Sequence, residues 1–301
     1  MPNLNTFTQL ALIGPTASGK TALSIKVAQQ HNAYILSLDS LSIYKEINIV
    51  SAKPTKEEQG DILHFGLDEL APSENFDVKT FIDLYHQVYE KCISDKKNLV
   101  IVGGTSFYLK MLINGISEVP KISDNTRLEA TKHLKDLAST YEWLYSLDPT
   151  YMIQIKPNDV YRIEKALHLY LETSLTPSIY FKRFPPKPTI SHTLPIYQIV
   201  WDRTLLRERI ALRTQLMVED GLIDEICMLE KKYTRKPNCM KSIGIKETLA
   251  YLDGVYDKKV LIEKITTNTA RLAKRQTTFN NSQFDTVIKG SVKELEEILL
   301  K

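Results

Sequence analysis

The stretch Gly14 to Thr21 reads GPTASGKT, and it directly follows the apolar run Leu10 to Ile13. Behind it, residues 22–28 (ALSIKVA) repeat apolar side chains at helical spacing. A strand, a loop of the form G-x-x-x-x-G-K-T and a helix in this order provide the context that a phosphate-binding P-loop requires. The stretch therefore predicts a phosphate site within an α/β fold.

Each part of this loop suits a bound phosphate. Gly14 and Gly19 allow backbone N–H groups to converge on phosphate oxygens, and the helix that follows adds the positive end of its dipole. Lys20 contributes a point charge, and the Thr21 hydroxyl is a predicted ligand of Mg²⁺. By itself the loop fits an NTPase, a small-molecule kinase or any enzyme that handles a diphosphate. The predicted phosphate-binding residues are Gly14, Thr16, Ala17, Ser18, Gly19, Lys20 and Thr21.

The composition limits the class of protein. The 301 residues, 43% hydrophobic and 25% charged, can bury one large core and a smaller second domain. No apolar run reaches the length of a membrane span, and the opening MPNLNTFTQL lacks the basic and apolar regions of a signal peptide, so we expect a cytoplasmic protein without membrane contact. The three cysteines form no C-x-x-C pair, which argues against zinc and disulfides.

Short apolar runs alternate with helical patterns in much of the chain. Strands are expected at residues 10–14, 34–39, 99–103 and 197–202, with a further edge strand at 286–288, and Val78 to Ile93 is a typical intervening helix. Between residues 115 and 195 the strand signals disappear and helical patterns take over. We therefore predict a P-loop parallel sheet flanked by helices, residues 1–116 and 195–301, with a mainly helical insertion domain at 117–194.

Two features bear on the choice among P-loop proteins. The strand ending at Val102 runs into Gly103-Gly104-Thr105, which carries no Walker B carboxylate, and this weakens the ATPase interpretation. The arginines that follow Asp202 resemble the arginine-rich segment of P-loop kinases, whose guanidinium groups neutralise a transferring phosphoryl group, so a kinase remains an alternative. These arginines are Arg203, Arg207, Arg209 and Arg213.

Asp39 and a basic helix are further candidates. Asp39 ends the second predicted strand, at the sheet edge where ligands of open α/β folds bind, so its carboxylate could act as a base, although such a residue is also a common turn or cap. Residues 264–284 contain no acid and place Arg271, Lys274 and Arg275 on one side of a helical pattern. That face could follow a nucleic-acid backbone or simply be solvated.

The chain contains a series of short motifs besides the P-loop: Asp39-Ser40-x-x-Ile43-Tyr44, Ala52-Lys53-Pro54, His64-x-x-x-Asp68, Gly103-Gly104-Thr105-x-x-Tyr108, Asp148-Pro149, Ile155-x-Pro157-Asn158-Asp159-x-x-Arg162, Arg209-Ile210-x-x-Arg213, Ser242-Ile243-Gly244-x-Lys246-Glu247 and Lys274-Arg275-Gln276. Together with the P-loop, these motifs resemble the tRNA dimethylallyltransferase family through most of the chain. The chain departs from the family pattern at three supporting positions, Ile245 (commonly Tyr), Phe279 (commonly Trp) and Ala270 (often Thr).

The resemblance implies a transferase that uses dimethylallyl diphosphate rather than ATP. The P-loop and Arg213 would hold the diphosphate, and the dimethylallyl group would pass to the N6 amine of the adenosine 3′ of the anticodon in tRNA, releasing pyrophosphate. Asp39 would accept the proton from that amine. Lys20, Arg209 and Mg²⁺ beside Thr21 would stabilise the leaving group. We expect the chain to act as a monomer.

The resemblance also implies where tRNA binds, with the helical insertion helping to clasp the anticodon stem-loop. Tyr44, Phe107 and Tyr108 could stack on the base or belong to the core. A small-molecule relative that prenylates free adenine nucleotides, a P-loop kinase and a non-catalytic RNA-binding protein are the alternatives. The implied tRNA-binding residues are Asp39, Ser40, Leu41, Ser42, Thr105, Tyr161, Arg162, Lys165, Lys241, Lys246, Arg271, Lys274 and Arg275.

Overall fold

The computed structural model describes residues 7–190 and 193–301. Residues 1–6, which open the N-terminal stretch considered above, and residues 191–192 lie outside the described part. The chain forms two compact units, Met1–Ile113 with Ile190–Lys301, and Asn114–Thr189. The sequence predicted boundaries at 116/117 and 194/195. None of the described helices combines the length and the hydropathy needed to span a bilayer.

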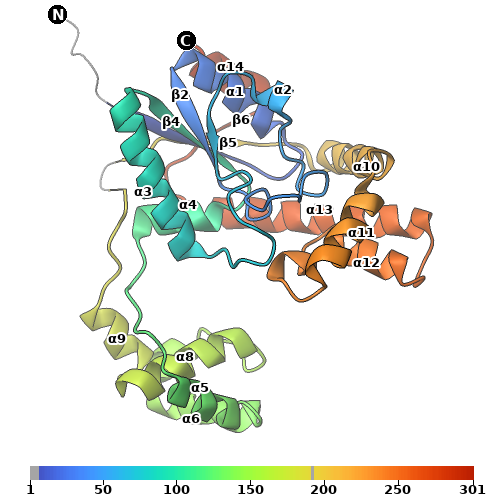
Figure 1. The fold of residues 1–301 in the computed structure, drawn as a ribbon. Coiled ribbons are helices and arrows are strands. Elements are labelled where there is room, and N and C mark those ends of the chain that lie inside the picture. The colour runs from blue at the N-terminus through green and yellow to red at the C-terminus, as the bar shows by residue number, and fades with distance from the viewer. Residues whose placement is uncertain (1–6, 191–192) are drawn as a thin grey trace, which may run out of the picture. The chain divides into compact units, whose positions relative to one another are not determined.

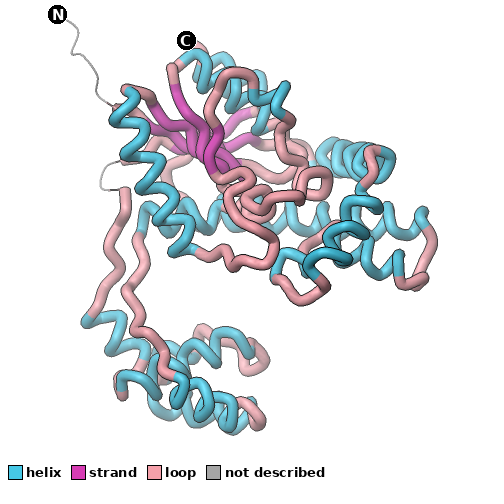
Figure 2. Tube along the Cα trace, viewed as in Figure 1, coloured by secondary structure: helices cyan, strands magenta, loops and turns pink. Residues whose placement is uncertain are grey.

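The first unit contains a six-stranded sheet, whose strands are magenta in Figure 2. Every pair of neighbouring strands is parallel, as the sequence predicted. The strand order is β3-β2-β4-β1-β5-β6, so β1, which leads into the P-loop, lies near the middle. The strands are β1 Gln9–Ile13, β2 Ala33–Ser37, β3 His64–Phe65, β4 Asn98–Gly103, β5 Ile196–Ile199 and β6 Ile288–Gly290.

Successive side chains of the strands enter opposite layers, because a strand alternates its faces with a period of two. Ala11 and Ile101 pack with α3 and α4, whereas Leu12 and Val100 pack with α1 and α14 (Figure 1). The helices of this unit are α1 Lys20–Gln30, α2 Lys56–Gln59, α3 Val78–Asp95, α4 Ser106–Asn114, α10 Arg203–Glu219, α11 Leu222–Tyr233, α12 Ile245–Leu252, α13 Lys258–Gln283 and α14 Val292–Leu299, with a 3₁₀ turn at Asn238–Lys241.

Several predicted boundaries are wrong by a few residues. The strand β2 ends at Ser37 rather than Asp39, and β5 ends at Ile199 rather than Asp202. Asp202 instead caps α10, which begins at Arg203, because its Oδ1 accepts hydrogen bonds from the N–H groups of Thr204 and Leu205. The edge strand β6 begins two residues later than predicted, and the two-residue β3 is too short to give a periodic pattern.

A second core in this unit joins α11, α12 and the first half of α13 to the loop that follows β2. Ile43 and Ile47 of the loop are buried there against Leu222 and Ile226 of α11 and Ile265 of α13. This packing holds the loop beside the helices that carry the basic residues.

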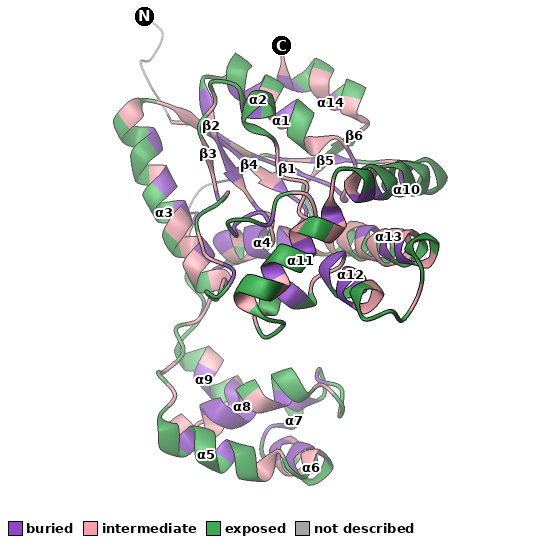
Figure 3. Ribbon diagram, turned by 45° about the vertical axis from the view of Figure 1, so that its right-hand side comes forward, coloured by how far each residue is buried: buried purple, intermediate pink, exposed green. Residues whose placement is uncertain are grey.

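The second unit is helical apart from its connections, and Figure 3 shows buried residues along one side of α8. Its core includes Tyr141, Met152, Ile163 and Leu167. Ser123, Asp136, Asp148 and Asp159 each accept a backbone hydrogen bond at the start of a helix, which explains why short helices form here. The helices are α5 Asp124–His133, α6 Leu137–Leu147, α7 Pro149–Met152, α8 Val160–Thr173 and α9 Pro177–Arg183.

Candidate active site

The P-loop lines a cavity of about 690 Å³ beyond the carboxyl end of β1. Gly19 has a φ of +88°, a conformation that glycine adopts without strain, and α1 begins at the next residue, Lys20. Gly14 does not line the cavity, because it is buried under the loop, where a Cβ would lie 3.1 Å from the carbonyl oxygen of Ile199. The other predicted phosphate-binding residues of the loop, Thr16 to Thr21, all line it.

Side chains of the segment that follows β5 hold the outer part of the loop. The indole Nε1 of Trp201 donates to the carbonyl oxygen of Ser18 at 2.9 Å. Arg209 Nε donates to the carbonyl oxygen of Ala17 at 3.0 Å, while its guanidinium lies 4.7 Å from the centre of the Trp201 ring. The hydroxyl of Ser18 is fully buried and has no hydrogen-bond partner among the described residues. Trp201 and Arg209 thus hold the loop through the carbonyl groups of Ser18 and Ala17.

Two further side chains hold Thr16. Arg213 Nη1 lies 3.3 Å from the Thr16 hydroxyl, and the Thr16 N–H donates to Oε1 of Gln276 at 2.9 Å. Gln276 belongs to α13 and also touches Gly104, where a Cβ would lie only 2.4 Å from Nε2. Gln276 belongs to one of the matching motifs, but no sequence pattern indicated that it contacts the P-loop.

Positive charge without a carboxylate partner collects in this cavity. In residues 7–190 and 193–301 no acidic group lies within 4.0 Å of the charged nitrogens of Lys20, Arg209 or Arg213, although all three side chains line the cavity. Burial, together with the charge of the neighbouring Arg213, lowers the pKa of Lys20 to about 7, although the charge of Asp39 opposes this shift. Burial also lowers the pKa of Arg213. A bound anion would relieve this cost, so the cavity favours an anionic ligand.

Asp39 lies just beyond β2 and faces the same space. Its Oδ1 accepts hydrogen bonds from the N–H groups of Leu41 at 2.8 Å and Ser42 at 3.1 Å. The second oxygen, Oδ2, takes part in none of the hydrogen bonds found among the described residues. One oxygen therefore fixes the side chain, and the other is left to accept a proton.

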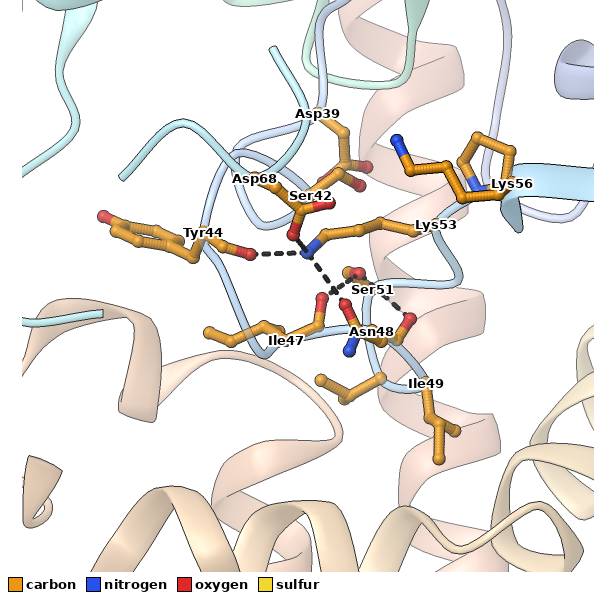
Figure 4. Close-up of polar contacts among 12 residues, drawn as sticks. Asp39, Ser42, Tyr44, Ile47, Asn48, Ile49, Ser51, Lys53, Lys56 and Asp68 are labelled. Carbon is orange, nitrogen blue, oxygen red and sulfur yellow. Dashed lines mark hydrogen bonds and ion pairs between the residues drawn. The ribbon is translucent and has the colours of Figure 1, made fainter. Parts of the chain in front are cut away.

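Lys53 holds the loop that begins at Asp39. Its side chain is only 6% exposed, and its Nζ donates to the Tyr44 carbonyl oxygen at 2.5 Å, to Asn48 Oδ1 at 3.1 Å and to Asp68 Oδ1 at 2.6 Å (Figure 4). Every donor position of the ammonium group is used. Lys53 therefore connects three separate parts of the segment from residue 44 to residue 68.

Glu225 of α11 holds the same loop from outside. Its carboxylate accepts hydrogen bonds from three consecutive backbone N–H groups, those of Asn48 at 2.9 Å, Ile49 at 2.8 Å and Val50 at 3.0 Å. The following residue, Ser51, lines the cavity. No sequence pattern indicated this contact, since nothing local links residue 225 with residues 48–50.

A second cavity of about 320 Å³ adjoins the first. Its walls include the apolar side chains of Leu41, Met217, Ile265 and Leu272. Because several residues line both cavities, we call this shared set the neck. The neck consists of Thr16, Ala17, Asp39, Ser51, Arg213 and Gln276.

The predicted tRNA-binding residues fall into four groups. Ser42 lines the larger cavity, and Lys246, Arg271, Lys274 and Arg275 are exposed and line neither cavity. The residues that line the smaller cavity are Asp39, Ser40, Leu41, Thr105 and Lys241. Those in the second unit are Tyr161, Arg162 and Lys165, all exposed on α8. Their contacts with tRNA stay predictions.

The three aromatic candidates separate by burial. Tyr44 and Tyr108 are 4% and 8% exposed and belong to the core, where the Tyr108 ring stacks on Phe81 with 5.1 Å between centroids. Phe107 is 46% exposed and lies 6.5 Å from the ring of Phe279. The bulk of Tyr44 and Tyr108 therefore supports the fold rather than a stacked base.

Residues 42–283 match the model of a family described as IPP transferase. The chain is 70% identical over 293 residues to the tRNA dimethylallyltransferase of Sulfurovum sp. (strain NBC37-1), covering 97% of each chain. It is 57% identical to the tRNA dimethylallyltransferase of Sulfurimonas denitrificans, covering 97% of this chain and 98% of the relative.

Solved structures of tRNA prenyltransferases are also similar to this chain. The full-length tRNA isopentenylpyrophosphate transferase of Bacillus halodurans superposes with a TM-score of 0.72 at 27% identity, covering 98% of this chain and 95% of the other. A eukaryotic dimethylallyltransferase acting on tRNA gives a TM-score of 0.82 at 25% identity, covering 94% of this chain and 74% of that one. The chain therefore belongs to the IPP transferase family, whose members in these comparisons are the tRNA dimethylallyltransferases.

Proposed function

We propose that the chain transfers a dimethylallyl group from dimethylallyl diphosphate to the N6 amine of the adenosine 3′ of the anticodon in tRNA, releasing pyrophosphate. Family membership supports prenyl transfer and a tRNA acceptor. The observation that carries the proposal is the neck, where the carboxylate of Asp39 lies between the cavity lined by Lys20, Arg209 and Arg213, none of which has a carboxylate partner, and a second cavity with partly apolar walls.

The larger cavity suits the donor. Backbone N–H groups at the start of α1, together with Lys20, Arg209 and Arg213, would bind the diphosphate oxygens. The smaller cavity suits the acceptor base, because its walls combine apolar side chains with Ser40, Thr105 and Lys241. Turning a stacked base out of the anticodon loop costs a few kcal/mol, which contacts of basic residues with the tRNA backbone would offset.

The reaction would take place at the neck. The lone pair of N6 forms a bond to the allylic carbon, and the bond between that carbon and the diphosphate oxygen breaks. The N6 proton passes to Oδ2 of Asp39, the oxygen that the loop leaves without a hydrogen bond. The departing pyrophosphate takes the electron pair of the broken bond, and its charge is stabilised by Lys20, Arg209 and Arg213.

The residues around the P-loop fit a magnesium ion that is shared with the substrate. Three or more acidic, histidine or cysteine side chains placed to hold a metal do not occur in the described chain. Mg²⁺ typically keeps several waters and needs only one or two protein ligands when phosphates supply the rest, and the Thr21 hydroxyl at the start of α1 lines the cavity. When bound, the ion would neutralise charge on the leaving pyrophosphate.

Parallel incubations test the proposal against its alternatives. The chain is mixed with labelled dimethylallyl diphosphate and unmodified tRNA or free AMP, and separately with labelled ATP and nucleosides. We expect label only on the tRNA, at the adenosine 3′ of the anticodon, and none on a tRNA with guanosine there. Label on AMP would support the small-molecule alternative, and phosphoryl transfer from ATP would support a kinase. A tRNA substrate also implies that the enzyme works in the cytoplasm. All residues of the neck belong to the first unit of one chain, which is compatible with action as a monomer.

A further inference from the structure

Gln276 presents an unused hydrogen-bond donor at the neck. The Thr16 N–H can only donate, so the side-chain atom 2.9 Å away must be the carbonyl oxygen Oε1, and this contact fixes which way the amide points. Contact with Gly104 on the other side restricts the amide further. Nε2 takes part in none of the hydrogen bonds found among the described residues, and Gln276 lines both cavities.

Asp39 supplies the complementary group. Its free Oδ2 is an acceptor, and it lines the same two cavities. The neck therefore offers one acceptor and one donor from two separate elements, the loop after β2 and helix α13. The Watson–Crick edge of adenine has the opposite pattern, because N6 carries hydrogens to donate and the adjacent N1 is an acceptor.

We propose that Gln276 determines the specificity for adenine: its Nε2 donates a hydrogen bond to N1 of the target base while Asp39 accepts from N6. This inference rests on the proposed function. Guanine and hypoxanthine carry a hydrogen on N1 and an oxygen at position 6. Their N1–H would therefore face the N–H donor of Gln276, and their O6 would face the acceptor oxygen of Asp39, so neither hydrogen bond could form. Discrimination of this kind is strong because the wrong base leaves buried polar groups unpaired.

The test is a cycle of one protein change and one substrate change. The substrates are two synthetic anticodon stem-loops that carry adenosine or 1-deazaadenosine at the target position, the latter with a C–H in place of N1. The proteins are the wild type and Gln276→Glu, which keeps an acceptor for Thr16 but has no donor for N1. The control Gln283→Glu makes the same change near the end of α13, outside both cavities.

The measured quantity is the ratio of kcat/KM for the two stem-loops with each protein. We expect the wild type and Gln283→Glu to prefer adenosine about tenfold, the size of one hydrogen bond, and Gln276→Glu to show a ratio near one or below. Any general slowing caused by the new charge cancels in the ratio. The affinity of each protein for dimethylallyl diphosphate is measured separately.

An unchanged preference for adenosine in Gln276→Glu would overturn the inference, because it would mean that Nε2 does not bind N1. If the affinity for dimethylallyl diphosphate were weakened as well, the amide would be assigned to the diphosphate site instead. Failure of the proposed function is a different outcome, because the wild type would then transfer no label to the adenosine stem-loop at all.

Discussion

The single carboxylate at the neck has two oxygens with different tasks. Asp39 Oδ1 accepts hydrogen bonds from the backbone N–H groups of Leu41 and Ser42, and this turn holds the side chain in place. An alanine at this position would remove the turn contact together with the base. Asparagine is the sharper substitution, because it keeps an oxygen for the turn and removes only the group that accepts the proton.

We expect Asp39→Asn to lower kcat by about 10²- to 10⁴-fold while dimethylallyl diphosphate and tRNA still bind within a few-fold of the wild type. The base acts on a proton only in the transition state, so ground-state affinity changes little. Single-turnover kinetics and equilibrium binding measure the two quantities. Asp77→Asn, at the cap of α3, is the control and should keep full activity. An unchanged kcat for Asp39→Asn would remove Asp39 from the mechanism.

Lys20 makes donor binding dependent on pH. Its pKa of about 7 in the free protein rises when a diphosphate binds, because the anion favours the ammonium form. Above pH 7 binding must therefore take up a proton, and affinity should fall as the pH rises from 7 to 9 by up to about tenfold per unit. Calorimetry in two buffers of different ionisation enthalpy measures this uptake. Lys20→Met should bind dimethylallyl diphosphate more weakly and without this proton uptake. If the variant took up the same proton, the uptake would belong to another group.

The same lowered pKa affects stability with the opposite sign. The unfolded chain holds this proton up to the ordinary lysine pKa of 10.5, whereas the folded chain loses it near pH 7. Between those values the unfolded state binds more protons, so this residue makes the free energy of unfolding rise with pH. Below pH 7 both states are protonated, and the ligand-free fold bears the full cost of the buried charge.

At the scale of elements, the loop from Asp39 to Thr55 depends on contacts with α11. Glu225→Ala removes the acceptor for three backbone N–H groups, and we expect the free energy of unfolding to fall by about 2 kcal/mol, as for hydrogen bonds to a charged group. Glu230→Ala, on the same helix, breaks an exposed pair with Arg235 and should cost under about 1 kcal/mol. Chemical denaturation compares them, and equal losses would mean that the loop does not depend on Glu225.

The basic face of α13 is the second element with a separable role. Lys274 and Arg275 line neither cavity, so we expect the double change to Gln to weaken tRNA binding and to reduce its salt slope by about one to two units. Affinity for dimethylallyl diphosphate should stay the same. Lys258 and Lys259, at the other end of the helix, provide the matched control. A normal salt slope with weakened diphosphate binding would instead place these side chains in support of the P-loop.

At the scale of the whole molecule, the second unit is an insertion whose ends leave the first unit side by side. The Ile190 N–H donates to the Leu112 carbonyl oxygen at 3.0 Å, so a short glycine-serine linker can join Ile113 to Ile190. We expect the shortened chain to fold and to bind dimethylallyl diphosphate within a few-fold of the full chain, and to lose most of its affinity for tRNA. Full tRNA affinity without residues 114–189 would exclude the insertion from tRNA binding.

The sequence alone determined what is local or strongly patterned. The P-loop is one continuous stretch, the parallel sheet follows from apolar runs that alternate with helices, and the loss of strand signals after residue 115 marks the insertion. The ends of the strands were not determined, because the local sequence at Asp39 and Asp202 is equally compatible with the end of a strand and with a residue that caps a turn or a helix. There the hydrogen bonds of the folded chain decided the boundary.

Only the tertiary structure decided how distant residues meet at the neck. Thr16 and Gln276 are 260 residues apart, and Asn48 and Glu225 are 177 apart, so no spacing or periodicity could relate them. Gln276 belongs to a helix whose sequence shows only a basic face and an apolar stripe. The direction of its amide is determined by the contacts with Thr16 and Gly104. The pKa of Lys20 has the same origin, because it reflects burial beside Arg213, which packing between α10 and the P-loop creates.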